Sequence, residues 1–81
     1  MAMKHYNQIV GFADRLNEAI SDIGMPQKQL AEKIGMERKT VSMWVNGYSM
    51  PNSLILARMC KVLNVSADYL LFGKRGDVNG S

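Results

Sequence analysis

Gly35 limits the folds open to this chain more than any other residue, because it stands between two short stretches in which apolar residues have helical spacing. The apolar positions on its two sides are Leu30, Ala31, Ile34, Val41, Trp44 and Val45. Only about three residues separate the two patterns, so the chain has to reverse in a tight turn there. Glycine can adopt the positive φ that such a turn requires. The spacing therefore predicts two short helices joined by a turn.

Small and large side chains in this segment predict which faces of the two helices meet. Ala31 falls where the helices would cross, and a larger side chain would push them apart. Val41 and Trp44 share one face of the later helix and point back toward the earlier one. Trp44 could stack on a nucleotide, but its phase with Val41 favours a core position. The outer face is left with Arg38, Lys39, Ser42 and Met43.

A longer helix is predicted over residues 9–23, before this segment, with Asn7 as its N-cap and Gly24 as its end. Its apolar stripe comprises Ile9, Phe12, Ala13, Leu16, Ala19, Ile20 and Ile23. The residues predicted to face solvent are Asp14, Arg15, Glu18 and Asp22. Pro26 suits the first position of the next helix, since its missing N–H costs nothing there.

Two more helices are predicted after a loop over residues 48–52 that contains Pro51. The first spans 53–63 and ends at Asn64, and its inward residues are Leu56, Met59, Cys60 and Leu63. The second begins at the N-cap Ser66 and ends before Gly73. The fold class is therefore all-α, a compact five-helix bundle over residues 9–73. Residues 1–8 would form an N-terminal arm, and 74–81 a polar tail or the start of a linker.

Composition excludes several classes of protein. Eighty-one residues suffice for one domain, and the single cysteine, Cys60, excludes an internal disulfide or a cysteine-based zinc cluster. The most apolar stretch, 54–63, is too short to span a membrane, and no signal peptide is visible. With one histidine, no catalytic triad pattern and no phosphate-binding loop, we expect no enzyme activity and no cofactor. A cytoplasmic protein with no membrane partner is expected.

Charge adds a modest preference for nucleic acid as the partner. The net charge is +3, and residues 26–50 carry four basic and two acidic side chains, whereas residues 1–25 have a net charge of −1. The basic excess therefore lies in the segment with the two short helices.

An ordered set of motifs resembles the helix-turn-helix domain of lambda-type phage repressors and Cro. It runs from Gln27 to Met36 (QKQLAEKIGM), continues through Thr40-Val41-Ser42 and Asn46-Gly47, and includes Pro51 and the helix 54–63. It closes with residues 65–73 (VSADYLLFG), so the resemblance covers roughly residues 9 to 73. The resemblance implies a five-helix bundle that places its third helix, about 37–46, in the DNA major groove.

The resemblance also implies which residues contact DNA. The expected base contacts are Arg38, Lys39 and Met43, flanked by Ser42 and Glu37. The expected phosphate contacts are Gln27, Lys28, Thr40, Asn46 and Tyr48. The chemistry of the side chains agrees, because arginine and lysine can donate to guanine and methionine can contact a thymine methyl group. Glu37 either complements the helix dipole or accepts from a cytosine amino group.

Two functions from different classes follow. The first is a sequence-specific transcriptional regulator of the phage-repressor type, binding double-stranded operator DNA as a homodimer. The apolar residues expected to form its dimer surface are Val65, Tyr69, Leu70 and Phe72. A further C-terminal domain in a longer parent protein is possible. The alternative is a helical protein-interaction module, antirepressor- or antitoxin-like, that does not contact bases. Arg38 and Lys39 favour the first function.

Overall fold

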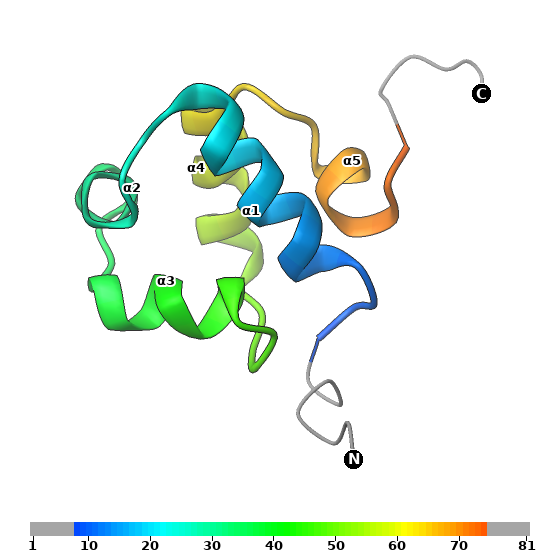
Figure 1. The fold of residues 1–81 in the computed structure, drawn as a ribbon, viewed down its shortest axis with the longest axis horizontal. Helices are drawn as coiled ribbons and strands as arrows, with labels where there is room; N and C mark the ends of the chain where they lie inside the picture. The colour runs from blue at the N-terminus through cyan, green and yellow to red at the C-terminus, as the bar shows by residue number, and fades with distance from the viewer. Residues whose placement is uncertain (1–7, 75–81) are drawn as a thin grey trace.

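A computed structural model describes residues 8–74, and these form five helices with no strand among them (Figure 1). The helices are α1 (Phe12–Ile23), α2 (Gln27–Ile34), α3 (Arg38–Val45), α4 (Ser53–Leu63) and α5 (Ala67–Phe72). The predicted all-α, five-helix fold is confirmed. Within residues 8–74 no helix is both long enough and apolar enough to cross a bilayer. The predicted arm and tail lie mostly outside the described residues.

One hydrophobic core joins all five helices. α2 packs against α3 and α4, while α1 packs against α3 and α5, so α3 and α5 occupy different sides of α1 (Figure 1). The side chains that are completely buried include Phe12, Leu16, Leu30, Ile34, Val41, Met59 and Leu70. Trp44 is also buried, which confirms that it is a core residue. Burial of these side chains is the main force that holds such short helices in place.

The first helix begins later than the sequence predicts. Gly11 occupies the N-cap position with φ +86°, and this left-handed conformation separates Ile9 and Val10 from the helix. Ile9 is therefore 38% exposed, and Ile23 at the other end of the predicted stripe is 43% exposed, so neither is a core residue. Asn7, the predicted cap, lies outside the described residues. The end of the helix at Gly24 is confirmed.

The turn between α2 and α3 is built as the sequence predicts. Gly35 has φ +78°, and the next N–H, that of Met36, donates to the Ala31 carbonyl at 2.9 Å. This bond is typical of a helix that ends at a left-handed glycine. Arg58 from α4 donates to the Ile34 carbonyl at 3.2 Å and so stabilises the same helix end. Pro26 is the N-cap of α2, one residue before the predicted position.

The bounds of α4 match the prediction, but its inward face is rotated slightly from the predicted one. Ile55 is buried, whereas Leu56 and Cys60 are only half-buried at the edge of the core. Partial burial raises the pKa of the Cys60 thiol, which favours the neutral form. Asn52, a cap that the sequence interpretation missed, accepts from the Ile55 N–H at 2.9 Å.

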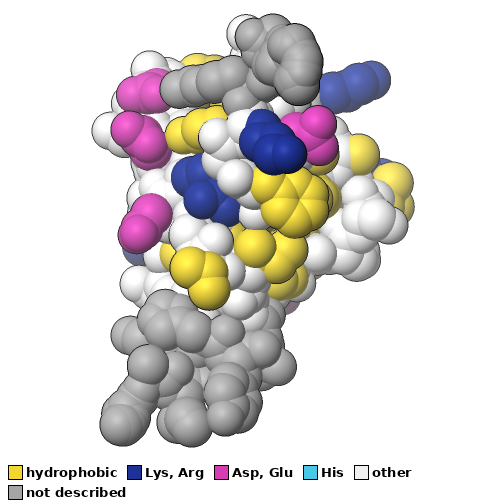
Figure 2. Space-filling model, turned by 90° about the vertical axis from the view of Figure 1, so that its right-hand side faces the viewer, with side chains coloured by type: hydrophobic (Ala, Val, Ile, Leu, Met, Phe, Trp, Pro, Cys, Tyr) yellow, Lys and Arg dark blue, Asp and Glu magenta, His cyan; other side chains and the backbone are white. Residues whose placement is uncertain are grey.

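The α5 end of the molecule differs from the prediction in two ways. Leu70 is completely buried in its own domain, so it cannot belong to a dimer surface. Arg15 does not simply face solvent, because its guanidinium donates to the Leu70 carbonyl at 3.0 Å and to the Leu71 carbonyl at 2.8 Å. The predicted cap is confirmed: the Ser66 hydroxyl accepts from the Tyr69 N–H at 3.0 Å. Figure 2 looks onto the right-hand side of Figure 1, where α5 lies, and hydrophobic side chains gather near the centre of this face.

Candidate nucleic-acid interface

The outer face of α3 presents polar, basic and apolar side chains together. The inner face of α3 is buried where the helix packs against α1 and α2, through Val41, Trp44 and Val45, and this packing fixes the rotation of the helix about its axis. Arg38, Lys39 and Met43 consequently point away from the core and are exposed. The helix thus combines a rigidly held inner face with long, accessible side chains on its outer face.

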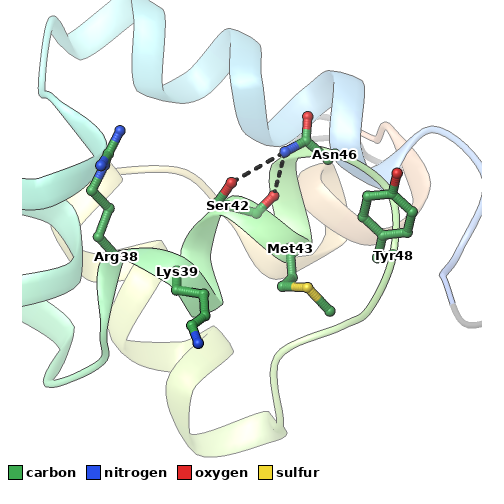
Figure 3. A pocket seen from close by; sticks show the side chains of 6 residues that line it. All are labelled: Arg38, Lys39, Ser42, Met43, Asn46 and Tyr48. Carbon is green, nitrogen blue, oxygen red and sulfur yellow. Dashed lines mark hydrogen bonds between the residues drawn. The ribbon is translucent and has the colours of Figure 1, made fainter.

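A shallow hollow of about 310 Å³ lies along this outer face. Its lining residues are Arg38, Lys39, Ser42, Met43, Asn46 and Tyr48 (Figure 3). Six of the ten residues that the sequence predicts as DNA contacts therefore lie around one depression. Four of them lie on α3 and are predicted base contacts: Arg38, Lys39, Ser42 and Met43. Asn46 and Tyr48 come from the end of α3 and the following loop.

Two lining residues are bonded to each other within the helix. The Asn46 side-chain amide donates to the Ser42 carbonyl at 2.8 Å and approaches the Ser42 hydroxyl at 3.2 Å (Figure 3). Just beyond, the Tyr48 N–H donates to the Met43 carbonyl at 2.9 Å. This backbone bond places Tyr48, which is 46% exposed, next to the last turn of α3.

The other four predicted contact residues lie outside the hollow. Gln27 is the first residue of α2 and is half-buried, and Lys28 beside it is exposed. Thr40 is half-buried on α3. Glu37 is the exposed N-cap residue of α3 and makes no side-chain cap bond, so its carboxylate lies near the positive end of the helix dipole without capping it.

Two amide side chains that the sequence interpretation did not identify fix the C-terminal end of α3. Gln8 is buried, and its amide donates to the carbonyls of Trp44 and Ser49, both at 2.9 Å. The Asn17 amide donates to the Val45 carbonyl, also at 2.9 Å. Gln8 thereby connects α3 to the loop that carries Tyr48. No local sequence pattern indicates these contacts, since the partners are 28 to 41 positions apart along the chain.

The outer face of α3 carries side chains whose chemistry suits contact with nucleic acid. Within residues 8–74, no three side chains of the types His, Cys, Asp and Glu are grouped so that they could hold a metal ion. Arginine and lysine can donate hydrogen bonds to guanine or phosphate oxygens, and an exposed methionine offers apolar contact. The surface therefore has the donors and the apolar group that contact with a DNA groove would use.

The sequence matches the Helix-turn-helix family over residues 22–70. It is 37% identical over 57 residues to the HTH-type transcriptional regulator ImmR of Bacillus subtilis (strain 168), an alignment that covers 70% of this chain and 45% of ImmR. It is also 32% identical over 63 residues to the HTH-type transcriptional activator BcrR of Enterococcus faecalis, covering 78% of this chain and 31% of BcrR. The chain thus spans less than half the length of these relatives.

The fold is similar to that of the P22 c2 repressor, whose crystal structure was solved in complex with the synthetic operator 9T in the presence of Tl⁺. The TM-score is 0.75 at 26% sequence identity, and the match covers 84% of this chain and 100% of that one. The resemblance to lambda-type repressor domains is confirmed. The family that matches is not a class of enzymes.

Proposed function

Because the chain belongs to the Helix-turn-helix family, we propose that it is a DNA-binding transcriptional regulator that acts in the cytoplasm on double-stranded DNA. One observation carries the proposal. α3 presents Arg38, Lys39 and Met43 around an open hollow while its opposite face is held in the core. In this function α3 enters the major groove, whose base edges present distinct donors, acceptors and methyl groups.

Contacts divide between bases and phosphates in this proposal. Arg38 contacts a base, because it lies on the outer face at the first residue of α3. Lys39, Ser42, Met43 and Glu37 are the other base-contacting candidates. Gln27 binds a phosphate, since it is the first residue of α2, where unpaired backbone N–H groups also favour an anion. Lys28, Thr40, Asn46 and Tyr48 are the other phosphate-contacting candidates.

The regulator binds its operator as a homodimer in this proposal. A single recognition helix contacts few base pairs, and related domains place two helices about 34 Å apart, one turn of DNA. The buried position of Leu70 removes it from the dimer surface, but Phe72 is 62% exposed and Val10 is 87% exposed. The Arg15 guanidinium donates to the backbone carbonyls of Val10 and Leu71, which brings Val10 close to the residue before Phe72. We propose that Phe72 and Val10, with Tyr69 and Val65, supply the apolar side chains for pairing.

Salt dependence of DNA binding tests the proposed function. Fluorescence anisotropy with a pool of random duplexes, repeated over a range of salt concentrations, should show binding that weakens with a slope of about −0.9 per phosphate contacted. The duplex that binds most tightly can be selected from this pool, and footprinting on it should show two protected half-sites. Absence of binding even at low salt would contradict the proposal and favour the alternative, a helical protein-interaction module. Protection of one half-site at saturation would contradict the dimer only.

Two substitutions test the division of contacts. Arg38→Ala should cost about 1–3 kcal/mol on the best duplex and relax preference at one base position. Gln27→Ala should weaken all duplexes evenly and leave the salt slope nearly unchanged, because glutamine is neutral. Lys61→Ala, which removes an exposed cation from α4, is the control for loss of charge alone. An equal loss on every sequence for Arg38→Ala would identify Arg38 as a phosphate contact.

A further inference from the structure

The hollow on the outer face of α3 has two chemically different ends. Arg38 and Lys39 line it at the N-terminal end of the helix, whereas Met43 and Tyr48 line it at the C-terminal end (Figure 3). Met43 is 43% exposed and Tyr48 is 46% exposed, so both present apolar surface. One end therefore offers charged donors, and the other offers a thioether and an aromatic ring.

The polar residues between the two ends are engaged with each other. The Asn46 amide donates to the carbonyl and approaches the hydroxyl of Ser42. An asparagine recognises adenine by presenting its amide donor and its carbonyl acceptor together to one base. Because the Asn46 amide nitrogen is turned toward Ser42, its donor side faces α3, and this part of the hollow is less suited to adenine (Figure 3). The apolar end is then the part that can add a second element of base specificity.

A backbone hydrogen bond holds Tyr48 next to Met43. The Tyr48 N–H donates to the Met43 carbonyl at 2.9 Å, and the turn passes through Gly47 with φ +88°. Gln8 holds the following loop through the Ser49 carbonyl. The backbones of Met43 and Tyr48 are therefore held next to each other at the end of α3, and both side chains line the hollow.

We infer that Met43 and Tyr48 form a subsite for the C5-methyl group of a pyrimidine in the major groove. This inference rests on the proposed function and specifies what the C-terminal end of the hollow recognises. The C5-methyl of thymine is the apolar group that a base pair presents in the major groove, and 5-methylcytosine presents the same group. Arg38 and Met43 are five residues apart, about 7.5 Å along the helix axis, which corresponds to about two base-pair steps. The methyl group recognised should therefore lie about two steps from the base that Arg38 contacts.

Removal of single methyl groups from the DNA tests the subsite. The probe is the best synthetic duplex selected from a random library, together with a series in which each thymine in turn is replaced by deoxyuridine. Deoxyuridine keeps every hydrogen-bonding group and lacks only the methyl. At one position per half-site the replacement should weaken binding about fourfold, the value expected for loss of one buried methyl group. At that position, a cytosine should bind about fourfold more tightly when it is methylated at C5, and this arm separates the methyl group from the rest of thymine.

Protein variants connect the effect to the subsite. Met43→Ala should bind the thymine and deoxyuridine duplexes equally, whereas Met43→Leu should keep most of the difference. Ile23→Ala is the matched control, because Ile23 has the same 43% exposure but lies on α1, outside the hollow. It should bind like the unmodified protein. Circular dichroism and melting should show that all three variants are folded.

The outcomes separate the subsite from the function on which it rests. If the protein binds the duplex but no deoxyuridine replacement weakens binding, the methyl subsite is wrong and DNA binding stands. If Met43→Ala keeps the full sensitivity to deoxyuridine, the methyl group is recognised elsewhere and the subsite is again wrong. If no duplex binds better than random DNA, the proposed sequence-specific function fails, and the subsite fails with it.

Discussion

The C-terminal ends of α3 and α5 are both held by side chains from the first part of the chain, but by different chemistry. At the end of α5, the charged guanidinium of Arg15 donates to the carbonyls of Leu70 and Leu71. At the end of α3, the neutral amides of Gln8 and Asn17 donate to the carbonyls of Trp44 and Val45. One helix end is therefore closed by a cation and the other by uncharged donors.

The difference follows from how much each helix buries. α5 has only six residues and one buried side chain, Leu70, so packing alone holds it weakly. A cation at its C-terminus adds charge-assisted hydrogen bonds and a favourable interaction with the helix dipole. α3 buries Val41, Trp44 and Val45, so neutral bonds are sufficient to fix its end. The cations of α3, Arg38 and Lys39, therefore remain on its exposed outer face and take no part in closing the helix end.

The largest expected effect is loss of the cation at the end of α5. Arg15→Ala should lower the free energy of unfolding by about 2–3 kcal/mol, because it removes hydrogen bonds from a charged donor to partly buried carbonyls. Urea titration followed by circular dichroism measures the change. Arg15→Lys keeps the charge but not the planar fork of donors, so its free energy of unfolding should lie between those of Arg15→Ala and the unmodified protein. A loss as small as that of Lys61→Ala would show that Arg15 does not hold α5.

Substitution of Gly11, whose neighbour is the Arg15 guanidinium, tests the same contact from the other side. Gly11→Ala should destabilise the protein by about 2 kcal/mol, since φ is +86° and the added Cβ would contact the Arg15 guanidinium. Gly24→Ala is the matched control, with φ +71° and no atom within 4 Å of the added Cβ, so it should cost only the backbone strain. The excess of Gly11→Ala over Gly24→Ala should vanish in an Arg15→Ala background. An unchanged excess in thermal melts of the double variant would exclude this coupling.

Loss of the neutral amide at the end of α3 should have a smaller effect on stability but a larger one on binding. Gln8→Ala should cost about 1–2 kcal/mol, because the buried Trp44 carbonyl and the partly buried Ser49 carbonyl lose a donor. Measured well below the melting temperature, DNA affinity should also fall, since the bonds through Gln8 that join Trp44 on α3 to Ser49 in the following loop are lost. Equal affinity for the folded variant and the unmodified protein would limit Gln8 to a structural role.

The smallest effect is expected at a local cap, which also serves as the control for Gln8. Ser66→Ala removes the hydroxyl that accepts from the Tyr69 N–H and should cost about 1 kcal/mol. Because Ser66 precedes α5 and lies outside the α3 hollow, DNA affinity should be unchanged below the melting temperature. A fall in affinity matching that of Gln8→Ala would mean that both variants act only through stability.

Features that depend on neighbours along the chain could be predicted from spacing and residue type. The turn at Gly35, the cap at Ser66 and the core position of Trp44 follow from glycine conformation, a capping hydroxyl and helical spacing. The same spacing placed Arg38, Lys39 and Met43 on the outer face of α3, and the order of the motifs indicated the family. The turn, the cap and the helix faces rest on interactions within a few residues, the range over which spacing carries structural information, whereas the family rests on the order of motifs along the whole domain.

Contacts between residues far apart along the chain could not be predicted in this way and follow from how the helices pack. Arg15 has the pattern of a solvated residue on α1, yet its partners are 55 and 56 positions away. Gln8 carries no sequence signal, and the left-handed Gly11 interrupts a stripe that appears continuous. Leu70 appears available for a dimer until the packing of α5 on α1 buries it. The physical reason is that unpaired carbonyls at helix ends need donors. The folded arrangement of the helices, rather than local spacing, determines which side chains reach them.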